Sequence, residues 1–278
     1  MVSNSSIKQE TKILQELQKT GYPTEIVSAS LMQWRGWGVI HNPTYLDDSE
    51  DRSREFDIRA YKSFDFEDGR FSIGVYLITE CKKSEKPWVF FMTPERYLQS
   101  RLGQLIKHNI TNKHIFTGID SSGSFIRDDE LREFHHYYQA DELARTYYEP
   151  FKGHEKSNRT NMIYSAVMSS VKATLFNNMY GESHEGWLGI FYPLIIFSGD
   201  LYKARVKSDK SVELESADHV QLSFHYTLPI AEKRRRSTWG RQLAYIVDIA
   251  HEDHLDQFLA MIESEHSLLK DLLSNRLE

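Results

Sequence analysis

The sequence predicts an α/β fold in which a mixed central sheet is flanked by helices. Segments with apolar residues at helical spacing alternate with short apolar, β-branched segments along the 278-residue chain. Hydrophobic residues make up 40% of the chain, which is enough to fill a substantial core. No internal repeat is evident, which argues against a stacked repeat architecture. We expect one elaborated domain over residues 1–278.

Two helices and an extended segment should open the chain. Apolar residues at helical spacing predict a first helix over residues 7–19, and Gly21 should end it. Pro23, followed by Thr and Glu, is typical of a helix start, and Gly36 ends the apolar pattern of this second helix. The next two segments should be extended and then turn, at residues 37–46 and 47–52.

Two strands should follow as an antiparallel hairpin. Apolar and polar residues alternate over 54–61, and residues 71–81 are apolar and β-branched enough for a central strand. Between them, Asp68-Gly69 has the chemistry of a tight turn. Such a hairpin places the ends of its two strands side by side.

The rest of the chain should add further helices and strands, with residues 93–156 forming an insertion on the core rather than a separate domain. The expected elements, in order, are a strand at 87–92, a short helix at 95–107, a Ser/Gly turn at 121–124, a long helix at 158–179, strands at 189–199, 201–206, 219–227 and 245–250, and a C-terminal helix at 252–273.

Composition restricts the class of protein. No segment has the apolar run of a signal peptide or a membrane-spanning helix, and the single cysteine, Cys81, cannot form an intramolecular disulfide. We therefore expect a cytoplasmic protein without a membrane partner. The net charge of −6 does not by itself favour nucleic-acid binding. The dense basic run at 233–236, with Arg241, is compatible with a solvated loop and with a loop that contacts phosphates.

The residues that carry chemistry lie in the predicted hairpin. Asp57 lies on the polar face of the first strand, and Glu80 and Lys82 share one face of the second, because side chains two positions apart point the same way. Two carboxylates can bind Mg²⁺, and the lysine can orient or help deprotonate an attacking water. This combination suits phosphodiester hydrolysis, and a structural ion pair is the alternative.

At these residues the sequence resembles the PD-(D/E)XK, or restriction-endonuclease-like, nuclease superfamily, whose pattern is an acidic residue on one core strand and (D/E)-x-K on the next. Glu25 matches the extra glutamate that many members carry on the first core helix. Phe56 stands where a proline often precedes the acidic residue, although many members lack that proline. The resemblance implies an αβββαβ core over about 21–92 and 157–200, with an insertion at 93–156 and a C-terminal extension at 201–278.

The resemblance also implies roles for the site residues. Asp57, Glu80 and the backbone carbonyl of Cys81 would bind Mg²⁺, for which Mn²⁺ can substitute. Lys82 would be the catalytic lysine, and Glu25 would help with the metal or its water. The implied function is a metal-dependent endonuclease acting on DNA, in restriction, phage defence or repair. The alternative is a catalytically inactive nucleic-acid-binding or scaffold protein with the same fold. Paired cuts in a duplex would favour a homodimer.

Other motifs carry less weight. His251, Glu252 and His254 lack the four-residue spacing of a zinc-protease helix, and helix capping explains them better. His135 and His136 have no metal-ligand spacing to a partner, so surface or core histidines are expected there. Nucleotide-binding glycine loops and a serine-hydrolase elbow are also missing from the sequence.

Overall fold

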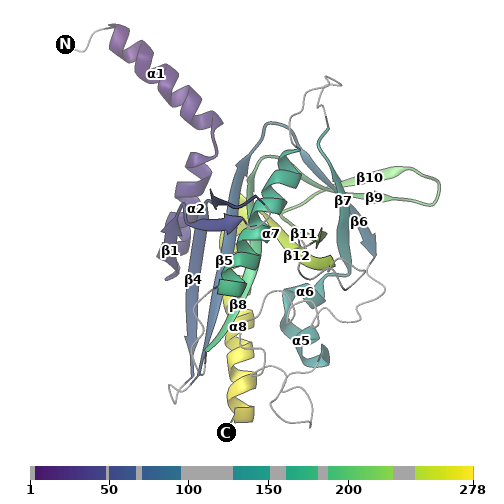
Figure 1. Cartoon of the computed structure of the whole chain (residues 1–278). Helices are drawn as coiled ribbons and strands as arrows, with labels where there is room; N and C mark the ends of the chain where they lie inside the picture. Colours follow the sequence, from purple (N-terminus) through teal and green to yellow (C-terminus); the bar gives the residue numbers. More distant parts are fainter. Residues whose placement is uncertain are drawn as a thin grey trace.

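The computed structural model describes residues 4–47, 50–66, 71–94, 128–150, 161–180, 187–227 and 242–277. Within these ranges, ten strands form one mixed sheet with helices packed on both of its faces, which confirms the predicted α/β class (Figure 1). None of the helices described is long and apolar enough to cross a membrane.

The strands of the large sheet are, in chain order, β1 (Gly38–His41), β4 (Ile58–Asp65), β5 (Ser72–Lys83), β6 (Trp88–Pro94), β7 (Glu142–Tyr148), β8 (Trp187–Ser198), β9 (Leu201–Val206), β10 (Val212–Ser216), β11 (His219–Thr227) and β12 (Gln242–His251). A separate hairpin consists of β2 (Thr44–Asp47) and β3 (Arg52–Glu55). The helices are α1 (Asn4–Lys19), α2 (Tyr22–Trp34), α5 (Asp128–Phe134), α6 (His136–Gln139), α7 (Met162–Tyr180) and α8 (Leu255–Leu277), and a 3-10 turn (Glu252–His254) precedes α8.

Most of the elements expected from periodicity are confirmed. The two N-terminal helices, the long helix and the C-terminal helix correspond to α1, α2, α7 and α8. The strands expected after residue 70 correspond to β5, β6, β8, β9, β11 and β12. β7 and β10 are additional elements that we did not expect. The features expected at 68–69, 95–107, 121–124 and 233–236, and Arg241, lie outside the described residues.

The strand expected over 54–61 is interrupted, because the chain bends at Phe56 and Asp57 between β3 and β4. Phe56 packs with Tyr45 in a core beside α7, whereas Ile58 packs in the core under α2 and α8, on the other face of the sheet. Two residues at i and i+2 of one strand share a face, so a continuous strand could not bury both side chains in this way. The bend leaves Asp57 at the entrance to β4.

β5 carries the residues of the candidate active site that is described below. It pairs antiparallel with β4 as far as Thr79, and it pairs parallel with β8 along its whole length. Side chains alternate along it, so Leu77 and Cys81 enter the core under α2 and α8, while Ile78 packs on the opposite face with residues of α7. Figure 1 shows α7 lying across β5 and β8. The end of β5 therefore lies between α2 and α7.

Strands from late in the chain lie inside the sheet. Its order is β1-β4-β5-β8-β12-β11-β7-β6-β9-β10. β12 pairs in parallel with β8, and β11 pairs antiparallel with β12. The segment expected as a C-terminal extension, 201–278, thus supplies four of the described strands. β7, from the segment expected as an insertion, pairs with β11 and β6.

The β9–β10 hairpin extends from one edge of the sheet (Figure 1). Every residue of β10 is exposed. One face of the hairpin carries ion pairs, in which Arg205 contacts Glu142 and Glu215 and Lys207 contacts Glu213. The other face is apolar, with Val206 opposite Val212 and Ala204 opposite Leu214.

Gly74→Ala should destabilise the fold. A Cβ atom at position 74 would lie 2.5 Å from Nε1 of Trp187 in β8, so the indole ring would have to move. We expect the free energy of unfolding to fall by about 1–3 kcal/mol in chemical denaturation. Gly38→Ala is the matched control, since its Cβ atom would meet only the Tyr61 carbonyl oxygen at 3.7 Å. An equal loss in both variants would contradict the importance of the Trp187 contact.

Candidate active site

Three oxygen-bearing groups meet around one ammonium group at the carboxyl end of β5. Nζ of Lys82 lies 2.5 Å from Oε2 of Glu80, 3.5 Å from Oδ2 of Asp57 and 3.1 Å from the carbonyl oxygen of Cys81. The backbone N–H of Cys81 also donates to Oδ2 of Asp57 at 2.6 Å. The structure thus brings together the two carboxylates, the carbonyl and the lysine that the sequence singles out.

Strand register explains this convergence. Ile58 pairs with Thr79 in the β4–β5 ladder, so the residue before Ile58 lies beside the residue after Thr79. These neighbours are Asp57 and Glu80. Lys82 follows on the same face as Glu80, because alternate residues of a strand point the same way. The bend at Asp57 directs its carboxylate to the backbone of β5, where the Cys81 N–H binds it.

Glu80 is the most buried charged residue of the site, with 4% of its surface exposed. Oγ of Ser169, in α7, donates to Oε1 of Glu80 at 2.5 Å, while Lys82 binds the other oxygen. Ser170, the next residue of α7, instead donates to the carbonyl of Ile78 at 3.0 Å. One turn of α7 is therefore fastened to β5 through both a side chain and the backbone.

Burial and charge act against each other on the titratable groups. Burial raises the pKa of Glu80, the Lys82 ammonium lowers it, and the net pKa is above the ordinary value. Burial alone would lower the pKa of Lys82, but the carboxylates of Glu80 and Asp57 outweigh burial and raise that pKa. Lys82 is therefore held as a cation in this arrangement.

Glu25 lies in the first turn of α2 and lines a pocket together with Asp57 and Lys82. The pocket has a volume of about 300 Å³ and is lined by Gly21, Tyr22, Glu25, Asp57, Cys81, Lys82, Lys83 and Met162. Burial and the nearby Asp57 raise the pKa of Glu25, whereas His41 lowers it. Nδ1 of His41, in β1, lies 3.7 Å from Oε1 of Glu25. Glu25 thus faces the site, although it makes no direct contact with Lys82 among the bonds observed.

The donor set suits a hard divalent cation. Two carboxylates and a backbone carbonyl are oxygen ligands of the kind that Mg²⁺ prefers, and all three already surround the positively charged Nζ of Lys82. Burial raises the pKa of the Cys81 thiol well above its usual value, so the sulfur stays protonated and is a poor ligand. Only the carbonyl of Cys81 fits the expected role.

Two residues of the site have no recognisable signal in the sequence. Ser169 looks like one more small residue on the inner face of a long helix, and its contact with Glu80 spans 89 positions. His41 lies in an extended segment with no motif around it. Neither residue has a local pattern that connects it with Asp57 or Glu80, so only the tertiary structure could reveal them.

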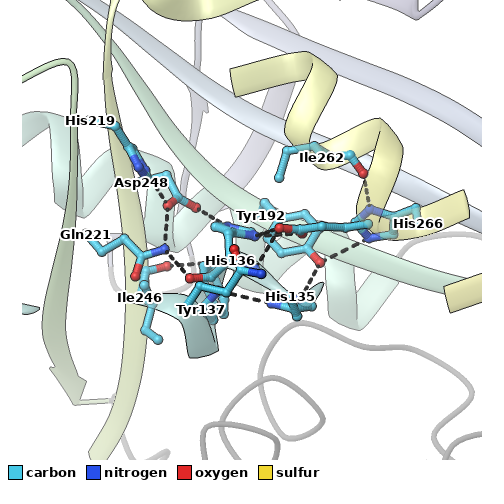
Figure 2. Close-up of polar contacts among 12 residues, drawn as sticks. His135, His136, Tyr137, Tyr192, His219, Gln221, Ile246, Asp248, Ile262 and His266 are labelled. Carbon is cyan, nitrogen blue, oxygen red and sulfur yellow. Dashed lines mark hydrogen bonds and ion pairs between the residues drawn. The ribbon is translucent and has the colours of Figure 1, made fainter. Parts of the chain in front are cut away.

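A second cluster of titratable groups lies elsewhere in the molecule (Figure 2). The ligand atoms of His135, His136 and Glu265 all lie within 4.8 Å of one another, and within the described ranges no other trio of His, Cys, Asp or Glu meets this condition. Sequence spacing alone indicates no metal-binding partner for the two histidines. The third member of the trio is Glu265 of α8, which contacts His136 across 129 positions of the chain.

Hydrogen bonds already occupy both ring nitrogens of His135. Its Nδ1 accepts from the Tyr137 backbone N–H at 3.2 Å, so its Nε2 carries the hydrogen that faces the Tyr192 hydroxyl at 3.1 Å. Tyr192 then donates to Nε2 of His266, also at 3.1 Å, and Nδ1 of His266 donates to the Ile262 carbonyl at 2.7 Å. This chain begins and ends on the backbone, and a metal ion would have to break it.

His136 is held between two buried carboxylates. Its Nδ1 lies 2.7 Å from Oε2 of Glu265, and its Nε2 lies 3.3 Å from Oδ2 of Asp248 in β12. Burial alone would lower the pKa of His136, but the two carboxylates raise it to about 10. His136 is therefore an imidazolium that joins α6, β12 and α8. We interpret the cluster as a structural ion-pair network.

Comparison with known proteins identifies no relative. No protein-family model, no curated protein and no solved structure matches this chain. The geometry of the site therefore carries the functional argument.

Acidification should destabilise the protein through His266. Burial, together with the charge on His136, lowers the pKa of His266 to about 4 from the usual 6.5. Between pH 6.5 and pH 4, His266 is protonated in the unfolded chain but not in the folded chain. Its contribution to the free energy of unfolding is therefore complete above pH 6.5 and is lost as the pH falls towards 4. Its upper bound is roughly 3 kcal/mol.

Urea denaturation across this pH range should show a steeper loss of stability for the wild type than for His266→Gln. Both proteins share the other titrating groups, so the difference between their slopes isolates His266. Parallel slopes would contradict the assignment.

Proposed function

We propose that this protein is a metal-dependent nuclease that hydrolyses the phosphodiester bonds of DNA. The observation that carries the proposal is the convergence of Asp57, Glu80 and the Cys81 carbonyl on the Lys82 ammonium at the end of β5. Those oxygen groups and that lysine are the ones expected from the resemblance to PD-(D/E)XK nucleases.

Each residue has a distinct proposed role. Asp57, Glu80 and the Cys81 carbonyl would hold Mg²⁺ or Mn²⁺. The bound cation would lower the pKa of a coordinated water and offset charge on the phosphate. Lys82, whose pKa is raised, would act as a hydrogen-bond donor that orients the water and stabilises negative charge rather than as a base. Glu25, with its raised pKa, would accept or return a proton at the rim of the pocket.

The order of elements supports the same proposal. α2, β1, β4, β5, α7 and β8 occur in the order αβββαβ once two insertions are set aside, namely the β2–β3 hairpin and the segment from β6 to β7. These strands are neighbours in the sheet in the order β1-β4-β5-β8. We propose that they form a restriction-endonuclease-like core, on which β6, β7 and β9 to β12 extend the sheet. We place this proposed enzyme in the cytoplasm, and paired cuts in a duplex would favour a homodimer.

The same contacts also favour a second candidate function. The 2.5 Å pair between Lys82 and Glu80 satisfies both charges without a metal. A protein that keeps this ion pair for stability could bind nucleic acid, or act as a scaffold, without cutting. The two functions differ in whether cleavage depends on a metal and on these side chains.

Asp57→Asn and Lys82→Ala should each lower nuclease activity at least about 100-fold, because each removes a charged group from the reacting centre. The assay is cleavage of plasmid DNA, single-stranded DNA and RNA by the full chain, with Mg²⁺ or Mn²⁺ and with a chelator. Asp65→Asn, at the exposed far end of β4, is the matched control and should cut normally. A folded wild type that binds DNA but cuts none of these substrates would establish the scaffold alternative.

Ser169→Ala should raise the metal concentration needed for half-maximal activity about 10- to 100-fold, because Glu80 would lose the hydroxyl that orients it. Activity at saturating metal should largely recover. Ser170→Ala is the matched control, since its hydroxyl binds the Ile78 carbonyl and not a carboxylate. The same metal dependence in both variants would show that Ser169 supports the helix and not the metal ligand.

A further inference from the structure

Two exposed apolar side chains line the candidate active-site pocket together with charged ones. Tyr22, at the start of α2, and Met162, at the start of α7, have 61% and 37% of their surfaces exposed. The charged residues of the lining are Glu25, Asp57, Lys82 and Lys83. The pocket therefore offers a ligand charged contacts and, beside them, an apolar surface that is open to solvent.

The backbone holds Tyr22 close to the proposed metal ligands. Its neighbour Gly21 packs against the end of β5, since a Cβ atom at position 21 would lie 3.5 Å from the Cys81 carbonyl oxygen. The Gly21 carbonyl accepts the Glu25 N–H at 3.0 Å, and Pro23 restricts the backbone further, so the start of α2 is fixed. Tyr22 is therefore one residue away from a contact with the Cys81 carbonyl.

Tyr22 presents its aromatic ring beside the groups that would hold a phosphate. The face of an aromatic ring stacks on a nucleic-acid base, whichever base it is. In an intact duplex, the neighbouring base pairs already cover both faces of each base. Only an unpaired base can therefore reach the Tyr22 ring.

Lys83 supplies a charge for the same nucleotide. It follows Lys82 at the end of β5 and lines the pocket. Its side chain forms no ion pair with any other described residue, so it is available to a phosphate. The pocket volume of about 300 Å³ lies at the lower end of the range for small-molecule sites, which suits one nucleotide rather than a duplex.

We propose that Tyr22 stacks on an unpaired base beside the phosphate bound in this pocket, and that the substrate is therefore single-stranded DNA. Met162 adds apolar surface for the same base or its sugar, and Lys83 binds the phosphate. This base contact rests on the proposed nuclease function, which supplies the metal-bound phosphate, and it adds the form of DNA that is cut.

Fluorescence anisotropy of the full chain tests base stacking separately from cutting. Ca²⁺ replaces Mg²⁺ in the assay, because it binds similar oxygen ligands and activates water less strongly. The probes are a labelled oligothymidylate of about 12 nucleotides, a blunt duplex of the same length, and an abasic oligomer that keeps the phosphates. The oligothymidylate should bind about tenfold more tightly than the abasic oligomer, because only the former has bases to stack.

Tyr22→Ala should weaken binding of the oligothymidylate about tenfold and leave binding of the duplex and the abasic oligomer unchanged. Tyr22→Phe keeps the ring and should bind as the wild type does. Trp34→Ala is the matched control, since Trp34 lies on the same helix with 81% of its surface exposed but does not line the pocket. Equal affinity of the wild type and Tyr22→Ala for the oligothymidylate would overturn the proposal. So would the absence of binding up to roughly 100 μM.

Cleavage with Mg²⁺ separates the base contact from the nuclease function. A wild type that binds the oligothymidylate through Tyr22 but cuts nothing would contradict the nuclease function while supporting the base contact. A wild type that cuts DNA, together with a Tyr22→Ala variant that has the same KM for the oligothymidylate, would overturn the base contact and not the nuclease function.

Discussion

The burial of the Glu80 carboxylate is the constraint on which the candidate active site depends. A carboxylate this far from water is tolerated only with compensating partners, and they come from separate elements. Ser169 provides one from α7, Lys82 another from β5, and Lys82 in turn contacts Asp57 at the entrance to β4. One contact that builds the site, from Ser169 to Glu80, therefore also links α7 to the sheet. A change at this point would therefore affect stability and the proposed chemistry together.

Local sequence patterns predict much of this architecture because most helices and strands bury one face or lie wholly inside. The placement of Glu80 and Lys82 on one face follows from the strand repeat alone. The bend at Asp57 does not follow from that repeat. It arises because Phe56 and Ile58 are buried in two different cores. Alternation along the sequence is the same whether or not the chain changes direction. Contacts such as Ser169 to Glu80 depend on how elements pack, which periodicity does not contain.

The half of the sheet beyond β8 is built mostly from strands that come late in the chain. β12 pairs with β8 only after β9, β10 and β11 have been made, so the centre of the sheet closes late in the sequence. His136 joins this half to α8 by contacts with Asp248 and Glu265 that span 112 and 129 positions. Non-local contacts of this kind are slow to form, because the entropy of closing long loops opposes them. They also explain why two adjacent histidines without a motif have a defined structural role.

The β9–β10 hairpin has a consequence for the behaviour of the protein at high concentration. An open edge strand presents unpaired N–H and C=O groups on which another chain can assemble. β10 is only five residues long, and Glu213 and Glu215 alternate along it with their charges tied to β9 and its following turn. A foreign strand would have to align beside these glutamates for very few backbone hydrogen bonds. The last strand of the sheet is thus a poor template for aggregation, even though Val212 and Leu214 are exposed on its other face.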